Sequence, residues 1–227
     1  MAEIIDLTIP IKEGEGRLET KVIFERPYTF EKHGWQGSNF RMFAHYPTHI
    51  DAPSHHFQDG QTIDEVPLNR LMGAAALIDL SDHGRNAGIT DDTLEERGHH
   101  TRPGDICILY TGWSDNWGTD KFWLEGPFLE PTGADWLVER EVAAIVYDFA
   151  AEYVVRKPDI LGKDCIIHHK ILGNNIYNIE YVQNLNKISN PRLTIIALPL
   201  KLVGLDGSPA RVIAIENMDL PGEFSIK

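Results

Sequence analysis

The feature that most constrains how this chain can fold is a run of twelve residues, 45–56, that contains four of the ten histidines and one aspartate. Pro47 and Pro53 exclude a regular helix here, because proline lacks an amide hydrogen and fixes its φ angle. We therefore expect an extended segment, either an edge strand or a loop. Side chains alternate between the two faces of an extended chain, so the odd-numbered members are predicted to point the same way: His45, His49, Asp51 and His55.

Two imidazoles and one carboxylate on a single face form a ligand set that suits zinc, manganese or iron. His45, His49 and Asp51 are therefore candidate metal ligands. Neither cysteine of the chain lies in this run, which argues against a structural zinc–thiolate site. The alternative is that the histidines merely cluster in the sequence and hold no resident ion.

Composition limits the partners and the compartment that we expect. The 227 residues fit one domain spanning 1–227, and the net charge of −13 disfavours binding to phosphate backbones and anionic lipid surfaces. We therefore predict a small-molecule substrate, with no binding to nucleic acid or to a membrane.

The cysteines and the N-terminal segment indicate the cellular location. Cys107 and Cys165 form no CxxC pair, and neither a signal peptide nor a spanning apolar run is found, so the cytoplasm is the expected location.

Short apolar runs typical of buried strands alternate with segments that have helical start and stop signals. Strands are predicted at Glu3–Thr8, Asn39–His45, Ala74–Leu80, Ile106–Tyr110, Val142–Tyr147, Leu193–Leu198 and Val212–Ile215. Helices are predicted from an N-cap at Thr90 to about Arg97, over Pro131–Arg140 and over Asp164–Leu172. Strands and helices that intermingle in this way predict a mixed α and β domain.

The histidine run resembles the signature of the cyclase family of metal-dependent hydrolases, which includes bacterial kynurenine formamidase and isatin hydrolase. That signature is a His, a Gly-Thr-His, an Asp, a Pro and a further His, which this chain matches at His45, Thr48-His49, Asp51, Pro53 and His55. Pro47 stands where the family has glycine. The resemblance implies that His45, His49 and Asp51 bind the metal and that His55 is the catalytic acid/base.

A second stretch extends the resemblance towards the C-terminus. His168 and Glu180, twelve residues apart, match the family segment that supplies a further histidine and glutamate as ligands. His168 is preferred to His169 because its spacing to Glu180 agrees with that segment. Tyr181 replaces the family's asparagine. Without the resemblance, His168 would be a residue on a helix face and Glu180 a solvated side chain.

The resemblance also implies a fold and an assembly. The fold is the swivelling β/β/α type of the cyclases, an α/β mixed single domain. The chain is expected to form a homodimer or a higher homo-oligomer, as relatives do.

The predicted ligands suggest the chemistry. Five ligands bridged by Asp51 would hold two divalent ions, whereas three would hold one; Zn²⁺ is the expected metal and Mn²⁺ the alternative. Metal-activated water would attack a carbonyl carbon while His55 moves a proton to the leaving group. The alternative role for His55 is to orient a ligand.

The expected reaction is hydrolysis of a C–N bond in an aromatic amide, as in an arylformamidase, with N-formylkynurenine as the first substrate to test. Hydrolysis of an isatin-type lactam or of a lactone is the second choice. A metal-dependent lyase and a non-catalytic metal binder are the alternatives from other functional classes.

Overall fold

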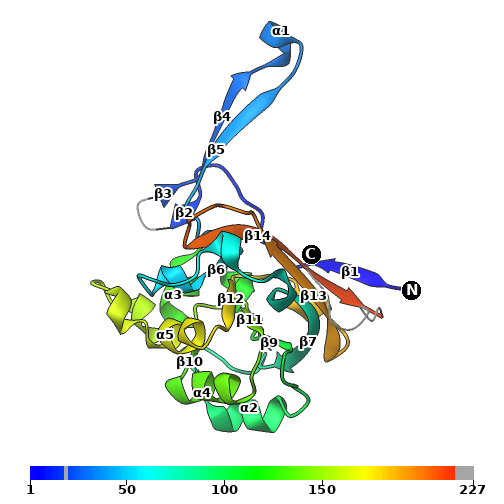
Figure 1. Ribbon diagram of the computed structural model, residues 1–227, viewed down its shortest axis with the longest axis vertical. Coiled ribbons are helices and arrows are strands. Elements are labelled where there is room, and N and C mark those ends of the chain that lie inside the picture. The colour runs from blue at the N-terminus through cyan, green and yellow to red at the C-terminus, as the bar shows by residue number, and fades with distance from the viewer. Residues whose placement is uncertain (18–19, 218–227) are drawn as a thin grey trace.

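The computed structural model describes residues 1–17 and 20–217, and its centre is one eight-stranded sheet that closes on itself (Figure 1). The strand order is β1-β14-β13-β7-β9-β11-β12-β6, and β6 also pairs with β14, so every strand except β1 belongs to a closed ring. The strands of this sheet are β1 (Glu3–Asp6), β6 (His49–Asp51), β7 (Met72–Asp79), β9 (Ile106–Tyr110), β11 (Ala144–Tyr147), β12 (Tyr177–Glu180), β13 (Arg192–Pro199) and β14 (Gly207–Glu216).

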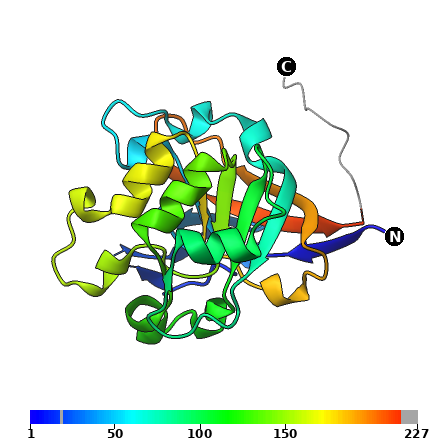
Figure 2. The ribbon, with the colours of Figure 1, turned by 90° about the horizontal axis from the view of Figure 1, so that it is seen from below.

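Helices cover one side of this barrel-like sheet (Figure 2). Helix α4 (Pro131–Glu139) contacts both α2 (Asp91–Arg97) and α5 (Ile166–Gly173). Helix α2 begins where the sequence predicts, since the Thr90 hydroxyl oxygen accepts a hydrogen bond from the backbone N–H of Thr93. The smaller elements are β2 (Gly16–Arg17), β3 (Thr20–Lys21), β4 (Ile23–Tyr28), α1 (Phe30–His33), β5 (Gly37–Arg41), β8 (Gly88–Ile89), α3 (Asp120–Glu125) and β10 (Phe128–Leu129).

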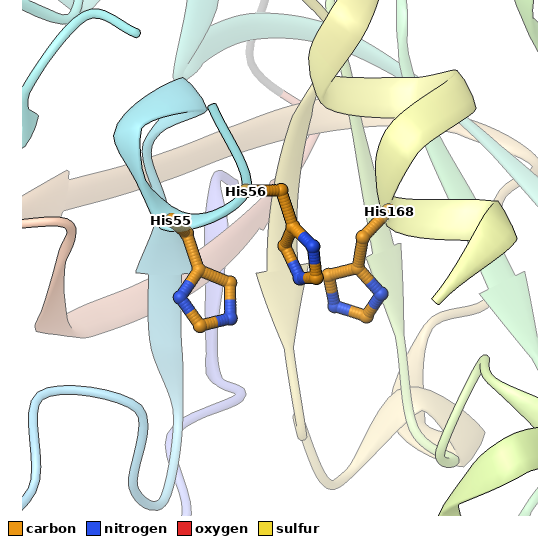
Figure 3. A group of neighbouring side chains, drawn as sticks. All are labelled: His55, His56 and His168. Atoms are coloured by element: carbon orange, nitrogen blue, oxygen red, sulfur yellow. The ribbon is translucent and has the colours of Figure 1, made fainter. Parts of the chain in front are cut away.

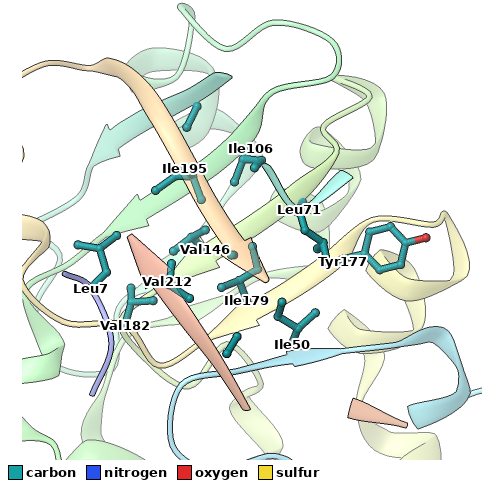
Figure 4. Packing of buried hydrophobic residues seen from close by; sticks show 14 of the residues in the cluster. Leu7, Ile50, Leu71, Ile106, Val146, Tyr177, Ile179, Val182, Ile195 and Val212 are labelled. Carbon is teal, nitrogen blue, oxygen red and sulfur yellow. The ribbon is translucent and has the colours of Figure 1, made fainter. Parts of the chain in front are cut away.

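The strands alternate between two hydrophobic cores, as the pleat of a sheet requires. Inside the closed sheet, Ile50, Val146 and Ile179 pack against apolar side chains from the other strands (Figure 4). On the outside, Ile145 and Tyr147 belong to a second core shared with the helices. Each strand therefore carries one row of side chains into the barrel and one row towards the helix layer.

This alternation places the polar residues of β6 and β12 on the outer face of the sheet. The two strands are antiparallel, with Glu180 opposite His49 and Asn178 opposite Asp51. Directly opposed residues of an antiparallel pair project from the same face. His49, Asp51 and Glu180 therefore leave the sheet together, on the side where α5 packs against β12.

A hairpin arm, residues 23–41, extends away from the barrel (Figure 1). It consists of β4 and β5, which pair with each other in a separate two-stranded sheet, and of α1 at its tip. None of its residues is buried. Phe30, Trp35 and Phe40 are more than half exposed, at 65%, 52% and 63%.

The structure confirms the mixed α and β class, and it corrects the expected path of the histidine run. The predicted strand Asn39–His45 is wrong at its end, because β5 stops at Arg41 and His45 lies in a turn. His55 lies in a 3₁₀ turn, Pro53–His55, so alternation along one extended segment relates only His49 and Asp51.

Strand β6 is also not an edge strand, as it pairs with both β12 and β14. Among the described residues, no helix is long and apolar enough to cross a bilayer. The extent of one domain over residues 1–227 stays a prediction.

An ion pair ties the start of β13 to the loop before β9. The Arg192 guanidinium donates to both carboxylate oxygens of Asp105, which also accepts a hydrogen bond of 2.7 Å from the backbone N–H of Arg102. Asp105 is buried, at 4% exposure. A paired carboxylate in this position is tolerated, whereas an unpaired one would cost several kcal/mol.

We predict that Arg192→Met lowers the free energy of unfolding by about 2–4 kcal/mol, because it leaves the buried Asp105 carboxylate without its cation. The control is Arg211→Met, which breaks the exposed ion pair with Asp6 and is expected to change stability little. Urea unfolding followed by circular dichroism measures both variants. Equal effects of the two substitutions would contradict the prediction.

Candidate metal centre

The carboxylate of Asp51 lies at the centre of a buried cluster of imidazoles and carboxylates. Its Oδ1 is 2.8 Å from His45 Nδ1 and 3.1 Å from His49 Nε2. All three residues are buried, with exposures of 1% for Asp51, 6% for His45 and 1% for His49. The turn before β6 and the strand itself thus bring together the three ligands predicted from the histidine run.

The other oxygen of Asp51 faces a second group of predicted ligands. Asp51 Oδ2 is 3.5 Å from His168 Nε2, which is 3.0 Å from Glu180 Oε1. Glu180 Oε2 in turn lies 3.6 Å from His49 Nε2. Glu180 Oε1 also accepts a hydrogen bond from the Tyr147 hydroxyl, which holds the carboxylate in place.

Two overlapping ligand groups therefore share Asp51. One is His45, His49 and Asp51, and the other is Asp51, His168 and Glu180; within each group the ligand atoms lie within 4.8 Å of one another. The structure places His168 here and not His169, whose Nε2 faces the carbonyl oxygen of Gly162 at 3.1 Å. All five predicted ligands converge, and their roles as ligands stay predictions.

Local backbone features explain why the imidazoles point as they do. The carbonyl oxygen of Pro47 lies 2.9 Å from His49 Nδ1, so it accepts that nitrogen's hydrogen and leaves Nε2 free to face Asp51. Proline at position 47 is thus compatible with the centre. Gly207 gives His45 room, because a Cβ there would lie 2.6 Å from Cε1 of the His45 ring.

Two carboxylates that were not predicted contact the ring nitrogens of His45 and His168 that do not face Asp51. Asp206 Oδ2 lies 2.9 Å from His45 Nε2, and Glu152 Oε1 lies 3.0 Å from His168 Nδ1. Ligating histidines generally pair their second nitrogen with such an acceptor, which fixes the tautomer and the ring orientation. The only sequence signals are an acidic residue beside Gly207 and a glutamate shortly after the buried strand β11.

His55 lies beside this cluster, with its ring stacked on that of His45 at 3.9 Å between centroids. Its Nδ1 is 3.2 Å from Asp206 Oδ2, so the same carboxylate contacts both histidines. The His56 side chain lies between those of His55 and His168 (Figure 3). Its ring centroid is 4.6 Å from that of His55 and 4.9 Å from that of His168. His56 was not predicted to be part of the site.

Electrostatics show what keeps the carboxylates charged despite burial. Burial opposes the charge on Asp51, but the electrostatic interaction with the adjacent His49 ring and the hydrogen bond from His168 hold the pKa of Asp51 well below its usual value. Burial and the Asp51 charge oppose ionisation of Glu180, yet His168 lowers its pKa to about 2. Burial likewise opposes protonation of His45, but Asp206 and Asp51 raise its pKa to about 9.

These residues fit a divalent cation. Buried carboxylates of this kind need a compensating positive charge, which protons on the imidazoles or a metal ion can supply. Imidazole nitrogens together with carboxylate oxygens are ligands of Zn²⁺, and they also suit Mn²⁺. The donor set therefore supports a divalent metal without selecting one.

The cluster forms the floor of a cavity of about 360 Å³. That volume lies at the lower end of the range for small-molecule sites. Apolar side chains form part of its wall, namely Phe43, Ala150, Ala151, Val155 and Ile160. The cavity thus combines a polar floor with an apolar wall, as binding sites for organic substrates usually do.

Comparisons with known proteins agree with this fold. The Cyclase family model, described as "Putative cyclase", matches residues 5–151. The kynurenine formamidase of Geobacillus thermodenitrificans is 32% identical over 172 residues, which cover 75% of this chain and 75% of that relative.

Two solved structures share the fold over nearly the whole chain. Isatin hydrolase A from Ralstonia solanacearum matches with a TM-score of 0.80 at 26% sequence identity. The match covers 94% of this chain and 92% of the isatin hydrolase chain. A structure described as a potential metal-dependent hydrolase with cyclase activity has a TM-score of 0.76 at 27% identity, covering 96% of this chain and 100% of its own. From the family match and the shared fold, we conclude that this chain belongs to the Cyclase family.

Proposed function

We propose that this protein is a metal-dependent hydrolase that cleaves the C–N bond of an aromatic formamide, with N-formylkynurenine as the first substrate to test. The observation that carries the proposal is Asp51, whose two oxygens face two ligand groups beside the imidazole of His55. The relative named kynurenine formamidase supports the choice of substrate.

Five side chains would hold the metal: His45, His49, Asp51, His168 and Glu180. A bound divalent cation would lower the pKa of water towards ~7 and polarise the carbonyl oxygen of the substrate. Zn²⁺ is the proposed ion, with Mn²⁺ as the alternative, and the shared Asp51 allows one ion or two.

His55 is the proposed acid/base. Because its Nδ1 faces Asp206, its Nε2 is the nitrogen left to exchange protons with substrate and water. In the hydrolysis, the water oxygen bonds to the formyl carbon and the C–N bond breaks. His55 Nε2 takes a proton from the water and returns one to the leaving arylamine nitrogen, so the products are the free amine and formic acid, which releases the second water proton to solvent as it ionises to formate.

A second candidate is the hydrolytic opening of an isatin-type lactam. It is favoured by the shared fold with isatin hydrolase A, and it needs the same attack of water on a carbonyl carbon attached to an aryl nitrogen. A metal-dependent lyase would use the same ligands without adding water. Incorporation of oxygen from labelled water into the product separates hydrolysis from a lyase reaction.

We propose a homodimer or larger assembly in which the hairpin arm packs on a second copy of this chain. A two-stranded hairpin is marginally stable alone in water, and this one leaves three large aromatic side chains exposed. Residues 23–41 carry three basic and two acidic side chains, whereas the whole chain has a net charge of −13. The arm therefore complements the acidic body of another copy.

Both cysteines are free, consistent with the cytoplasm that we propose as the location of this protein.

We predict that His55→Ala lowers kcat on N-formylkynurenine by about 10²–10⁴-fold while the metal content of the protein is retained. His49→Ala is the matched variant and is expected to lose metal and activity together. Elemental analysis of untagged protein and an arylamine-release assay measure both quantities. The opposite pattern would mean that the two histidines have exchanged roles.

Removal of the metal from the wild type provides a further test of the proposed function. A chelator is expected to abolish turnover, and Zn²⁺ or Mn²⁺ to restore it. Activity that survives chelation, at undetectable metal content, would exclude the metal-dependent mechanism.

We predict that Asp206→Asn reduces metal affinity or kcat by about 10–100-fold, because it removes the charge that orients His45 and His55. Competition with a chromophoric chelator measures affinity, and initial rates measure kcat. Asp64→Asn, at an aspartate that contacts Thr62 and Gly204 instead, is the control and is expected to behave as wild type. Wild-type values for Asp206→Asn would remove this residue from the site.

For the assembly, we predict that the double variant Phe30→Ser and Trp35→Ser lowers the molar mass in light scattering to that of a monomer. Val203→Ser, at a residue that is 81% exposed in the loop between β13 and β14 and thus outside the arm, is expected to leave the mass unchanged. A wild type that is already monomeric would contradict the proposal.

A further inference from the structure

Arg17 on β2 is the one lysine or arginine among the described residues that line the cavity above the metal centre. Its guanidinium carbon lies 3.9 Å from the centre of the Trp123 ring, in cation–π geometry. Its Nη1 donates a hydrogen bond of 2.8 Å to the Tyr181 hydroxyl. These two contacts hold the guanidinium at the cavity wall.

The guanidinium has no acidic partner among residues 1–17 and 20–217. Five other arginines form ion pairs, namely Arg85, Arg97, Arg140, Arg192 and Arg211, whereas Arg17 lines the cavity without one. Arginine carries five N–H donors, and the hydrogen bond to Tyr181 uses one of them. The remaining donors form a fork that matches a carboxylate in two-point geometry.

The Tyr181 side chain lies between Arg17 and the metal centre and shows how the two are placed relative to each other. The Tyr181 ring lies 5.3 Å from the ring of His49, and its hydroxyl contacts Arg17. A substrate whose reacting carbonyl lies over the metal centre would therefore need its anionic group on the Tyr181 side of the cavity. Away from the candidate ligands, Arg17 is the one arginine or lysine among the described lining residues, so it is the group that would attract an anionic substituent.

We propose that Arg17 forms an anion subsite that binds a carboxylate of the substrate. The inference rests on the proposed function and narrows its substrate class to N-acylated arylamines with a side-chain carboxylate, in preference to uncharged lactams. N-formylkynurenine, which has such a carboxylate, fits this subsite, whereas isatin leaves it unused.

The test compares N-formylkynurenine with its carboxamide, which has the same shape and no negative charge. We expect kcat/KM of the wild type to be about 10–100-fold higher for the acid, the range given by a charge-assisted hydrogen bond. Arg17→Leu is expected to remove this difference by raising KM for the acid, with kcat and metal content unchanged and the carboxamide unaffected.

Three further variants separate the subsite from structural effects. Arg17→Lys keeps the charge but loses the fork, and is expected to restore only part of the preference. Tyr181→Phe removes the hydrogen bond to Arg17 and is expected to retain the preference for the acid, because the contact with Trp123 remains. Arg26→Leu, on the exposed arm, is the matched control and is expected to behave as wild type.

Binding without turnover makes this inference independent of the reaction. Titration calorimetry with 3-benzoylpropionate and its amide is expected to show tighter binding of the acid to the wild type, and equal binding of both to Arg17→Leu. If no formamide is hydrolysed but this pattern holds, the proposed function fails and the anion subsite stands. If acid and amide bind the wild type equally, and Arg17→Leu changes neither, the subsite is overturned.

Discussion

Burying the carboxylate of Asp51, which is 1% exposed, would destabilise this fold unless groups of complementary charge surrounded it. Three imidazoles meet that requirement, and they come from three places: the turn before β6, β6 itself and helix α5. Closure of the barrel is what brings these elements together, because β6 is fixed between β12 and β14. The metal centre is therefore a consequence of how the sheet closes, on the face where a helix layer can add a further ligand.

The division of the strands between two cores also separates stability from chemistry. Inward residues such as Ile50 and Ile179 are apolar and fill the barrel, while their neighbours in sequence carry the ligands on the outer face. A change of register by one residue along β6 would place Asp51 inside the barrel. Packing of the apolar side chains inside the barrel therefore fixes the register of β6, and with it the residues that face the metal centre.

Groups around the centre hold its histidines in defined orientations. The Pro47 carbonyl, Asp206 and Glu152 each contact the outer nitrogen of one histidine. Asp206 also contacts His55, so the candidate acid/base and a candidate ligand depend on one carboxylate. On the cavity wall beside Tyr181, Arg17 adds a positive charge that belongs to none of the candidate ligands. Together these groups divide the cavity into a reacting end and a recognition end.

Local signals predicted the elements that depend on local interactions, such as the Thr90 cap of α2 and the apolar strand β9. The five ligands could be named because they match a family signature, whereas alternation along the chain related only His49 and Asp51. His55 reaches the cluster through a 3₁₀ turn, which the strand period cannot predict. Asp206 and Arg17 were missed because each meets its partner across more than 160 residues of chain. Glu152 was missed although His168 is only 16 residues away, because both lie outside the strands and no local pattern relates them.

The most direct test of the shared carboxylate is the number of Zn²⁺ ions retained by metal-free protein after titration and dialysis, in the wild type and in Asp51→Asn. Asp148→Asn serves as the control, since Asp148 is equally buried but hydrogen-bonded to Thr111 and Gly112, away from the centre. If Asp51 serves both ligand groups, its substitution abolishes all high-affinity binding, whereas the control retains the wild-type number. Retention of a high-affinity ion by Asp51→Asn would contradict a centre built on this one residue.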